Sequence, residues 1–129
     1  MPQIDVVFFQ NEHGQVPVFE WLQQLRARDR KGYAKCVARL RRLALLGHEL
    51  RRPEADYLRD DIYELRAKFG RVNYRILYFF HGRTMAILAH ALTKEDKLPD
   101  ADIDRAVRRK QAFQRNPKRH SYEEELSDG

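Results

Sequence analysis

The sequence predicts a single α+β domain in which a strand, two helices, three strands and a final helix follow one another, giving the order β-α-α-β-β-β-α. The 129 residues of the chain fit one domain. The hydrophobic period changes from 3.6 residues to 2 after about residue 54, and the segments with period 2 are joined by short turns that contain glycine. We therefore expect a small, antiparallel-dominated sheet with the two N-terminal helices packed on one face.

The N-terminal third of the chain contains the first strand and both of these helices. Ile4–Phe9 is β-branched and aromatic, which is typical of strands. Pro17 favours a helix start because its ring fixes φ, and a second helix should run from about Asp29 to Leu46, with Gly47 as its cap. The apolar residues at helical spacing, which should face the sheet, are Val18, Leu22, Leu25, Tyr33, Val37, Leu40 and either Leu43 or Ala44.

The three remaining strands occupy the middle of the chain. In Ile62–Phe69, apolar and charged side chains alternate, which predicts a strand with one buried face and one charged face. Val72–Phe80 is strongly apolar and should be the central strand, and Met85–Leu92 should be the last one. Gly70 and Gly82 mark the turns between them. These short connections predict an antiparallel meander whose second face stays partly open.

A helix and a polar tail are expected to end the chain. Asp100 should begin the last helix, which buries Ile103, Val107 and Phe113. Beyond residue 115 the composition is polar and acidic. We therefore assign the folded domain to residues 1–115 and expect residues 116–129 to be a disordered tail.

The charge of the chain favours a polyanionic partner. It carries 25 Lys and Arg against 19 Asp and Glu, a net charge of +6. Residues 116–129 contain two basic and four acidic residues, which leaves a charge of +8 on residues 1–115. A domain this basic suits nucleic acid, although the same charge also serves solubility.

Several classes of site and location are disfavoured by the composition. The one cysteine, Cys36, fits a buried and unreactive helix position. His13, His48 and His120 have no partner at the spacing of metal ligands, and no glycine-rich nucleotide motif is present, so we expect no metal or cofactor. No stretch approaches the ~18 consecutive apolar residues of a membrane span, and the N-terminus does not resemble a signal peptide. We therefore expect a cytoplasmic protein without membrane contact.

The open face of the sheet carries the main candidate functional residues. With period 2, Arg66 and Lys68 point the same way as Glu64, and Arg75 is the one charged residue of its apolar strand. If the register places Arg75 beside the other two cations, three positive charges meet on one surface. Placing an arginine there costs desolvation that an anionic ligand can offset. Alternatively, Arg75 pairs with Glu64 and has no role in binding.

Further basic residues extend this set. His90, near the end of the last strand, and Lys94, just after it, are also candidate catalytic residues. His90 is in phase with Leu88 and Leu92, so it fits a half-buried structural histidine equally well. The residues that we expect to bind a nucleic-acid backbone are Arg71, Lys97, Arg39 and Arg42.

Two segments, Tyr57–Arg66 and Gly70–Phe80, resemble the RelE/ParE toxins, and the closest branch is the phage-derived Gp49-like, HigB-type group. His90–Lys94 and the last helix also fit, so the resemblance covers roughly residues 4–113. It implies a RelE-like fold and the toxin of a type II toxin–antitoxin system, held inactive by a cognate antitoxin that is often a helix-turn-helix protein. Active members enter the ribosomal A site and cleave mRNA without a metal.

The resemblance also implies which residues act. Carried over by position, they are Arg66, Lys68, Arg75 and Lys94. In metal-free cleavage the 2′-hydroxyl attacks the adjacent phosphate, and fixed arginines stabilise the negative charge that gathers in the transition state. Lys68 or His90 can take the 2′ proton, while Lys94 can protonate the leaving oxygen or hold a flanking phosphate.

Three functions stay open at this point. The first is a ribosome-dependent mRNA endoribonuclease that inhibits translation, the second is a non-enzymatic ParE-like toxin that poisons a protein target such as DNA gyrase, and the third is a degenerate toxin that only binds its antitoxin. All three share the fold, so the open face must discriminate between them. Converging cations favour RNA chemistry, and a neutral face favours protein binding. The C-terminal catalytic tyrosine of some members has no counterpart, since Tyr122 lies in the expected tail.

Overall fold

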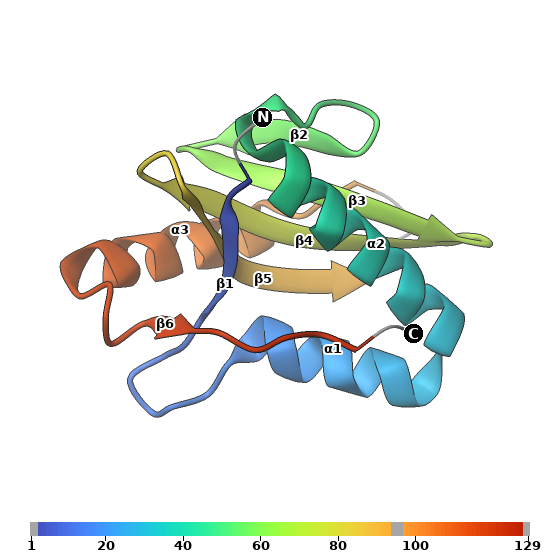
Figure 1. Ribbon diagram of the computed structural model, residues 1–129, viewed down its shortest axis with the longest axis horizontal. Helices are drawn as coiled ribbons and strands as arrows, with labels where there is room; N and C mark the ends of the chain where they lie inside the picture. Colours follow the sequence, from blue (N-terminus) through green and yellow to red (C-terminus); the bar gives the residue numbers. More distant parts are fainter. Residues whose placement is uncertain (1–2, 94–96, 128–129) are drawn as a thin grey trace.

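The computed structural model describes residues 3–93 and 97–127 and contains a six-stranded sheet with helices on both faces (Figure 1). Within these residues, no helix has the length and apolar character needed to cross a membrane. The predicted α+β class and the order of its seven elements are confirmed. The elements are β1 (Asp5–Phe9), α1 (Pro17–Arg28), α2 (Arg30–Leu46), the short 3-10 helix η1 (Gly47–Glu49), β2 (Ala55–Arg59), β3 (Ile62–Phe69), β4 (Val72–His81), β5 (Met85–Thr93), α3 (Asp100–Arg115) and β6 (Ser121–Tyr122).

The strands lie in the order β2-β3-β4-β5-β1-β6. Strands β3 to β5 form the antiparallel meander that the short glycine turns predict, and β2 pairs antiparallel with β3 at its outer edge. Strand β1 pairs in parallel with β5, with Val7 opposite Ile87. The α1–α2 pair then carries the chain across one face of the sheet, from β1 to the edge strand β2. The sheet is therefore antiparallel except at this one pair of strands.

Helices α1 and α2 cover one face of the sheet, where Figure 1 shows α2 crossing in front of β3 and β4. Helix α2 begins and ends where the sequence predicts, since the Asp29 side chain accepts a hydrogen bond from the Gly32 N–H at 3.1 Å and Gly47 is the C-cap. Asp29 also accepts a hydrogen bond from the Tyr74 hydroxyl at 2.9 Å. Burial and this bond raise the pKa of Tyr74 to about 12. The start of α2 is thereby fixed to the central strand β4.

Helix α3 packs on the opposite face, and Figure 1 shows it behind the strands. Its buried residues Ile103 and Phe113 contact the second apolar cluster, in which the rings of Phe79 and Phe113 meet edge to face at 5.4 Å. In Figure 1 the tip of the β3–β4 hairpin extends well past α3. This face of the sheet is therefore covered at one end and open at the other.

Strand β2 was not predicted, because the sequence analysis assigned no strand before Ile62 in this part of the chain. It forms a hairpin with β3 through the two-residue turn Asp60-Asp61, whose φ angles are 53° and 62°. Tight hairpin turns of this kind usually contain glycine or asparagine, because both central residues need positive φ. Aspartate tolerates the left-handed conformation but is a weaker signal. The sequence therefore gives no clear signal for this turn or for the edge strand β2 that precedes it.

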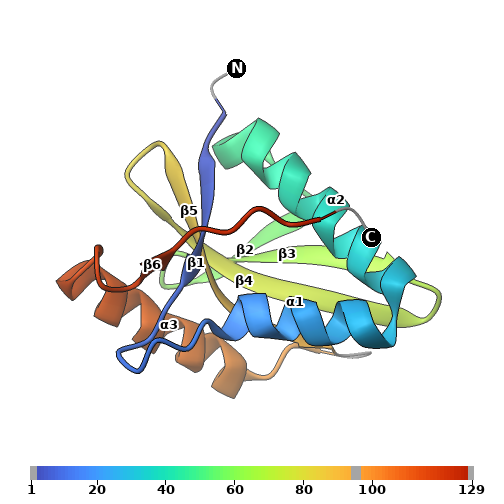
Figure 2. The same cartoon turned by 60° about the horizontal axis from the view of Figure 1, so that its bottom comes forward.

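The C-terminal segment also differs from expectation, since disorder was predicted after residue 115. Strand β6 pairs with Phe8 and Phe9 of β1. His120 is buried, and its ring stacks on Phe9 at 5.2 Å between centroids. The Tyr33 hydroxyl donates to the Ser127 carbonyl at 3.0 Å, so the segment returns across the molecule to α2 (Figure 2). Residues 116–127 therefore pack against the rest of the chain, while the domain boundary at residue 115 stays a prediction.

Replacing Gly32 with alanine should destabilise the protein, although alanine is the better helix former by about 1 kcal/mol. A Cβ atom at this position would lie 2.8 Å from Cζ of Tyr74 and overlap its hydroxyl. We expect the free energy of unfolding to fall by about 1–3 kcal/mol in a denaturant titration, as is common for overpacking. The exchange Ala34→Gly, at an exposed site of the same helix, measures the propensity alone. A Gly32→Ala protein as stable as the wild type would show that Tyr74 moves aside freely.

Candidate functional site

The predicted cations Arg66, Lys68 and Arg75 meet on the open end of the face that α3 covers only in part. In the register of the hairpin, Arg66 of β3 lies opposite Arg75 of β4, and Lys68 lies opposite Asn73. Because side chains alternate along a strand, all of them stand on the same side of the sheet. The Arg66 side chain is 40 % exposed and that of Arg75 is 17 % exposed. Two guanidinium groups from adjacent strands are therefore neighbours at the surface.

A buried carboxylate lies between these two arginines. The Glu64 side chain is only 1 % exposed. Its Oε1 accepts a hydrogen bond from Nε of Arg66 at 2.8 Å, and its Oε2 accepts one from Nη1 of Arg75 at 2.6 Å. The pairing of Arg75 with Glu64, which the sequence left open as an alternative, is thus present. It partly neutralises both arginines and at the same time holds their guanidinium planes in place.

Asp56 of β2 extends this arrangement toward the edge of the sheet. Its Oδ2 lies 3.3 Å from Nη2 of Arg66 and 2.9 Å from Nη2 of Arg52. The bond from Arg52, with the nearby charges of both arginines, lowers the pKa of Asp56 below its ordinary range. We call the series Arg52–Asp56–Arg66–Glu64–Arg75 the charge ladder. Three guanidinium groups against two carboxylates leave it with one net positive charge, to which the exposed Lys68 adds another.

His90, the predicted acid–base candidate of β5, lies between β5 and α3. It is 8 % exposed, and its Nε2 is 2.6 Å from Oδ1 of Asp102. Nη1 of Arg109 donates to the Ala89 carbonyl at 2.7 Å and lies 3.4 Å from Nδ1 of His90. Burial lowers the pKa of His90, and the positive charge of Arg109 adds to this, while the bond to Asp102 opposes it. The position matches the structural alternative, a histidine that ties α3 to the sheet.

The four predicted backbone-binding residues do not gather at one place. Arg71 is exposed in the turn between β3 and β4, and Lys97 is exposed just before α3. Arg39 and Arg42 lie on α2, on the opposite face of the sheet, and both bind the carboxylate of Glu54, at 2.7 and 2.8 Å. These two arginines therefore fasten α2 to the sheet and do not extend the surface of Arg66. The remaining catalytic candidate, Lys94, lies outside the described residues.

Two members of the charge ladder, Arg52 and Asp56, were missed by sequence reasoning. Asp56 meets Glu64 in the register of β2 and β3, so its place follows only once β2 is known to be a strand. The pairing of Glu64 with Arg75 could be anticipated, because Glu64 is the one carboxylate in the charged stripe of the neighbouring strand. Its burial was the unexpected feature, since a charged stripe normally faces solvent.

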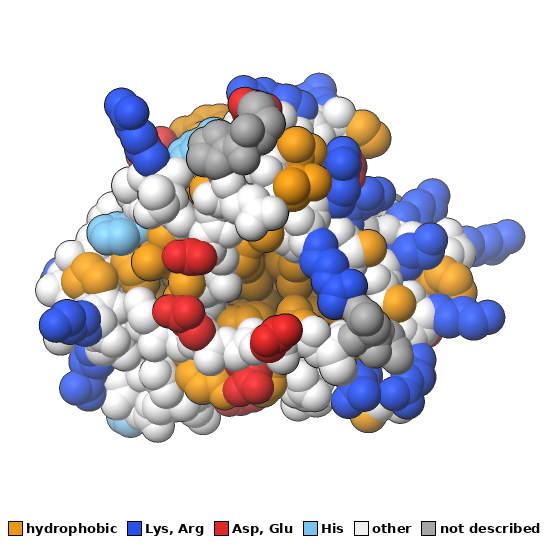
Figure 3. Space-filling model, viewed as in Figure 1, with side chains coloured by type: hydrophobic (Ala, Val, Ile, Leu, Met, Phe, Trp, Pro, Cys, Tyr) orange, Lys and Arg blue, Asp and Glu red, His pale blue; other side chains and the backbone are white. Residues whose placement is uncertain are grey.

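The face that carries α1 and α2 offers less to a polyanion in the region around β1 and β6. Figure 3 shows a hollow with an apolar floor on the face seen in Figure 1, with acidic groups along its border. A groove of about 280 Å³ on this side is lined by Val6, Phe8, Leu40, Glu124 and Leu126, among others. Within residues 3–93 and 97–127 no three His, Cys, Asp or Glu side chains gather as a metal-binding group.

Cys36 is not a candidate nucleophile. The cysteine lies on the buried side of α2, in the core, as its helical setting predicts. Burial raises the pKa of its thiol to about 12. Since the thiolate is the reactive form of cysteine, this side chain stays inert at neutral pH. The charge ladder with Lys68 is the candidate anion-binding site.

Acidification should destabilise the protein through His90. Because its pKa lies below the ordinary 6.5 in the folded state, the folded protein binds this proton less readily than the unfolded chain does. The stabilising effect is fully present above pH 6.5 and is lost as the pH falls through the folded pKa. Thermal unfolding between pH 7.5 and 5 should show a smaller loss of stability in His90→Gln than in the wild type. His13→Gln, at an exposed site, is the control, and equal pH dependence in both variants would contradict this role.

Comparison with known proteins identifies the family of the chain. A family model described as phage derived protein Gp49-like (DUF891) matches residues 20–111, which run from α1 to α3 and include the whole charge ladder. A search of curated proteins found no match. The family match spans well over half of the chain. The chain therefore belongs to the phage-derived Gp49-like family of RelE/ParE-like toxins, a membership that implies an antitoxin as its partner.

Proposed function

We propose that this protein is the toxin of a type II toxin–antitoxin system and that it cleaves mRNA on the ribosome without a metal ion, which stops translation. The observation that carries the proposal is the pair Arg66 and Arg75, opposite each other on adjacent strands and oriented by Glu64. A guanidinium has five N–H donors, so the bonds of Arg66 to Glu64 and Asp56 do not exhaust its capacity to bind a phosphate. The exposure of Arg66 keeps this surface accessible to a ligand.

The chemistry that this pair supports is attack of the ribose 2′ oxygen on the adjacent phosphorus. A bond forms between that oxygen and phosphorus while the bond from phosphorus to the 5′ oxygen breaks, giving a cyclic phosphate and a 5′-hydroxyl. Negative charge gathers on the phosphoryl oxygens in the transition state, where Arg66 and Arg75 stabilise it. Because Glu64 already orients both groups, little reorganisation is needed during the reaction.

Two protons must move in this reaction, one from the 2′-hydroxyl and one to the leaving 5′ oxygen. Lys68 is exposed on the same side of β3 as Arg66, and we assign one of these transfers to it. Lys94 remains the candidate for the other transfer. His90 receives no proton-transfer role, since it lies beneath α3 with both ring nitrogens near Asp102 and Arg109.

The partners of this function are mRNA within the ribosome and a cognate antitoxin, which we propose to be of the helix-turn-helix type. The charge of +8 on residues 1–115 attracts a polyanion over a distance of about 10 Å at moderate salt. Arg71, in the turn between β3 and β4, and Lys97, just before α3, are exposed and supply further contacts to the RNA backbone. An antitoxin inhibits this activity by covering the ladder or by blocking entry into the ribosome.

One observation favours a second candidate, a non-enzymatic toxin that binds a protein target as ParE-type members do. Glu64 and Asp56 reduce the ladder to one net positive charge, which is less than three unpaired cations would supply. A surface of paired charges is common where proteins recognise one another, because it sets specificity. Transcript cleavage is the property that separates the two candidates.

Removing Arg75 or Lys68 should abolish growth arrest upon expression. We expect RNA cleavage by the purified protein on ribosomes to fall by about 10²–10³-fold in each variant, the usual effect of losing one group that stabilises the transition state. Lys68→Ala changes an exposed side chain and should keep the fold, whereas Arg75→Ala also leaves Glu64 with one partner fewer. Cleavage is measured by mapping transcript 5′ ends within translated frames.

Arg83→Ala is the matched control for these variants, because it removes the same charge from the exposed turn between β4 and β5. It should arrest growth as the wild type does. Melting temperatures of all three variants identify any loss of folding. The nuclease would be rejected, and the protein-binding toxin favoured, if Lys68→Ala arrested growth as the wild type does while neither Lys68→Ala nor the wild type produced new transcript ends.

A further inference from the structure

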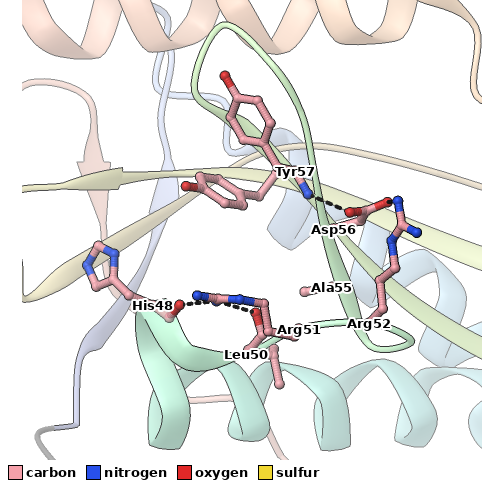
Figure 4. Close-up of a pocket in the computed structure, with 8 residues that line it drawn as sticks. His48, Leu50, Arg51, Arg52, Ala55, Asp56 and Tyr57 are labelled. Atoms are coloured by element: carbon pink, nitrogen blue, oxygen red, sulfur yellow. Dashed lines mark hydrogen bonds and ion pairs between the residues drawn. The ribbon is translucent and has the colours of Figure 1, made fainter.

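A hollow of about 630 Å³ lies at the outer edge of the sheet, between β2, β3 and the turn η1. Figure 4 shows Tyr57 of β2 on one side of it, with His48 and Arg51 across from that ring and with the Arg52–Asp56 pair at its rim. Leu50 and Ala55 contribute apolar surface. The hollow is therefore bordered by aromatic rings and by arginines, and none of these residues belongs to the predicted catalytic set.

The aromatic rings around this hollow are held in place by the core beneath them. Tyr57 is 51 % exposed, and its ring meets that of Tyr63 edge to face at 5.2 Å. The ring of Tyr63 in turn stacks on Tyr78 at 5.5 Å. On the other side, His48 stacks on Phe80 at 3.7 Å between centroids. A flat aromatic group that enters the hollow finds rigid ring surfaces, which lowers the entropic cost of stacking.

The charges around the hollow favour an anionic guest over a cationic one. The Arg51 guanidinium donates to the carbonyl oxygens of His48 and Leu50, which carry no net charge to neutralise it. The one carboxylate in the lining, Asp56, already binds Arg52 and Arg66. A lysine or arginine side chain of a protein partner would therefore meet positive charge, although the aromatic rings alone would suit it. Aromatic rings combined with arginine are the usual means of binding an unpaired nucleotide.

We infer that this hollow binds one unpaired base of the RNA, with the base against Tyr57 and a phosphate beside Arg51 and Arg52. This inference rests on the proposed function and adds a second contact to it. Asp56 links the two places, because the same carboxylate oxygen contacts Arg52 at the hollow and Arg66 in the charge ladder. An RNA strand that crosses the edge strand β2 thus places one phosphate at the ladder and a nearby base in the hollow. The hollow selects which base sits near the cleaved bond.

Binding of RNA that cannot be cleaved tests this inference without reference to catalysis. The probe is a tetranucleotide in which every ribose carries a 2′-O-methyl group, so that no 2′-hydroxyl can attack. We expect Tyr57→Ala of the full-length chain to bind it about tenfold more weakly or worse, the effect of losing one base–aromatic stack. Tyr57→Phe keeps the ring and should bind within about twofold of the wild type. Arg51→Gln should weaken binding and reduce its dependence on salt.

Leu45→Ala is the matched control, since Leu45 is an exposed apolar residue of α2 that does not line the hollow. Its affinity for the tetranucleotide should equal that of the wild type. Unchanged binding by Tyr57→Ala overturns the inference, as does binding of an arginine-rich peptide at Tyr57 in place of RNA. The proposed nuclease fails by a different result, namely RNA binding that depends on Tyr57 while no transcript is cut.

Discussion

The burial of the Glu64 carboxylate is the constraint on which the candidate functional face depends. A carboxylate with 1 % exposure remains charged only if cations and hydrogen bonds replace the lost water. Arg66 of its own strand and Arg75 of the next strand supply these partners, one to each oxygen. The same bonds that stabilise the buried charge also fix the directions of both guanidinium groups. The positions of the two arginines are therefore a consequence of the fold and do not require a ligand.

The way α3 is attached explains why this face is open where the arginines stand. Apolar packing around Phe113 and the contacts of His90 with Asp102 and Arg109 hold α3 over β5 and the adjoining part of β4. Arg59 adds an ion pair with Asp104 at 2.7 Å, at the end of β2. None of these contacts involves the part of the β3–β4 hairpin near Gly70. The helix thus completes the core on one half of the sheet and leaves the other half to polar side chains.

Hydrophobic period and turn residues were sufficient to predict the elements that bury a whole face, such as Val72–His81 and the α2 helix between Asp29 and Gly47. They could not predict β2, because five residues of mixed polarity follow no period and its turn contains neither glycine nor asparagine. In the site, Arg75 was identifiable as a lone charge among apolar residues. Arg52, Asp56 and Tyr57 were not, since their roles arise from pairing with distant segments.

The prediction that Arg39 and Arg42 bind a nucleic-acid backbone beside Arg66 also failed to foresee a contact with a distant segment. Helical spacing shows that both point away from the apolar stripe. It does not show that Glu54, just before β2, binds both of them. In the proposed function, attraction of RNA rests on the charge of the whole domain, while local chemistry rests on the few oriented groups of the ladder. On the same proposal, we expect a ladder of one net charge to bind a phosphate weakly in its ground state and to gain most when that phosphate acquires further charge. Weak ground-state binding beside an aromatic hollow suits an enzyme better than it suits a simple RNA-binding protein.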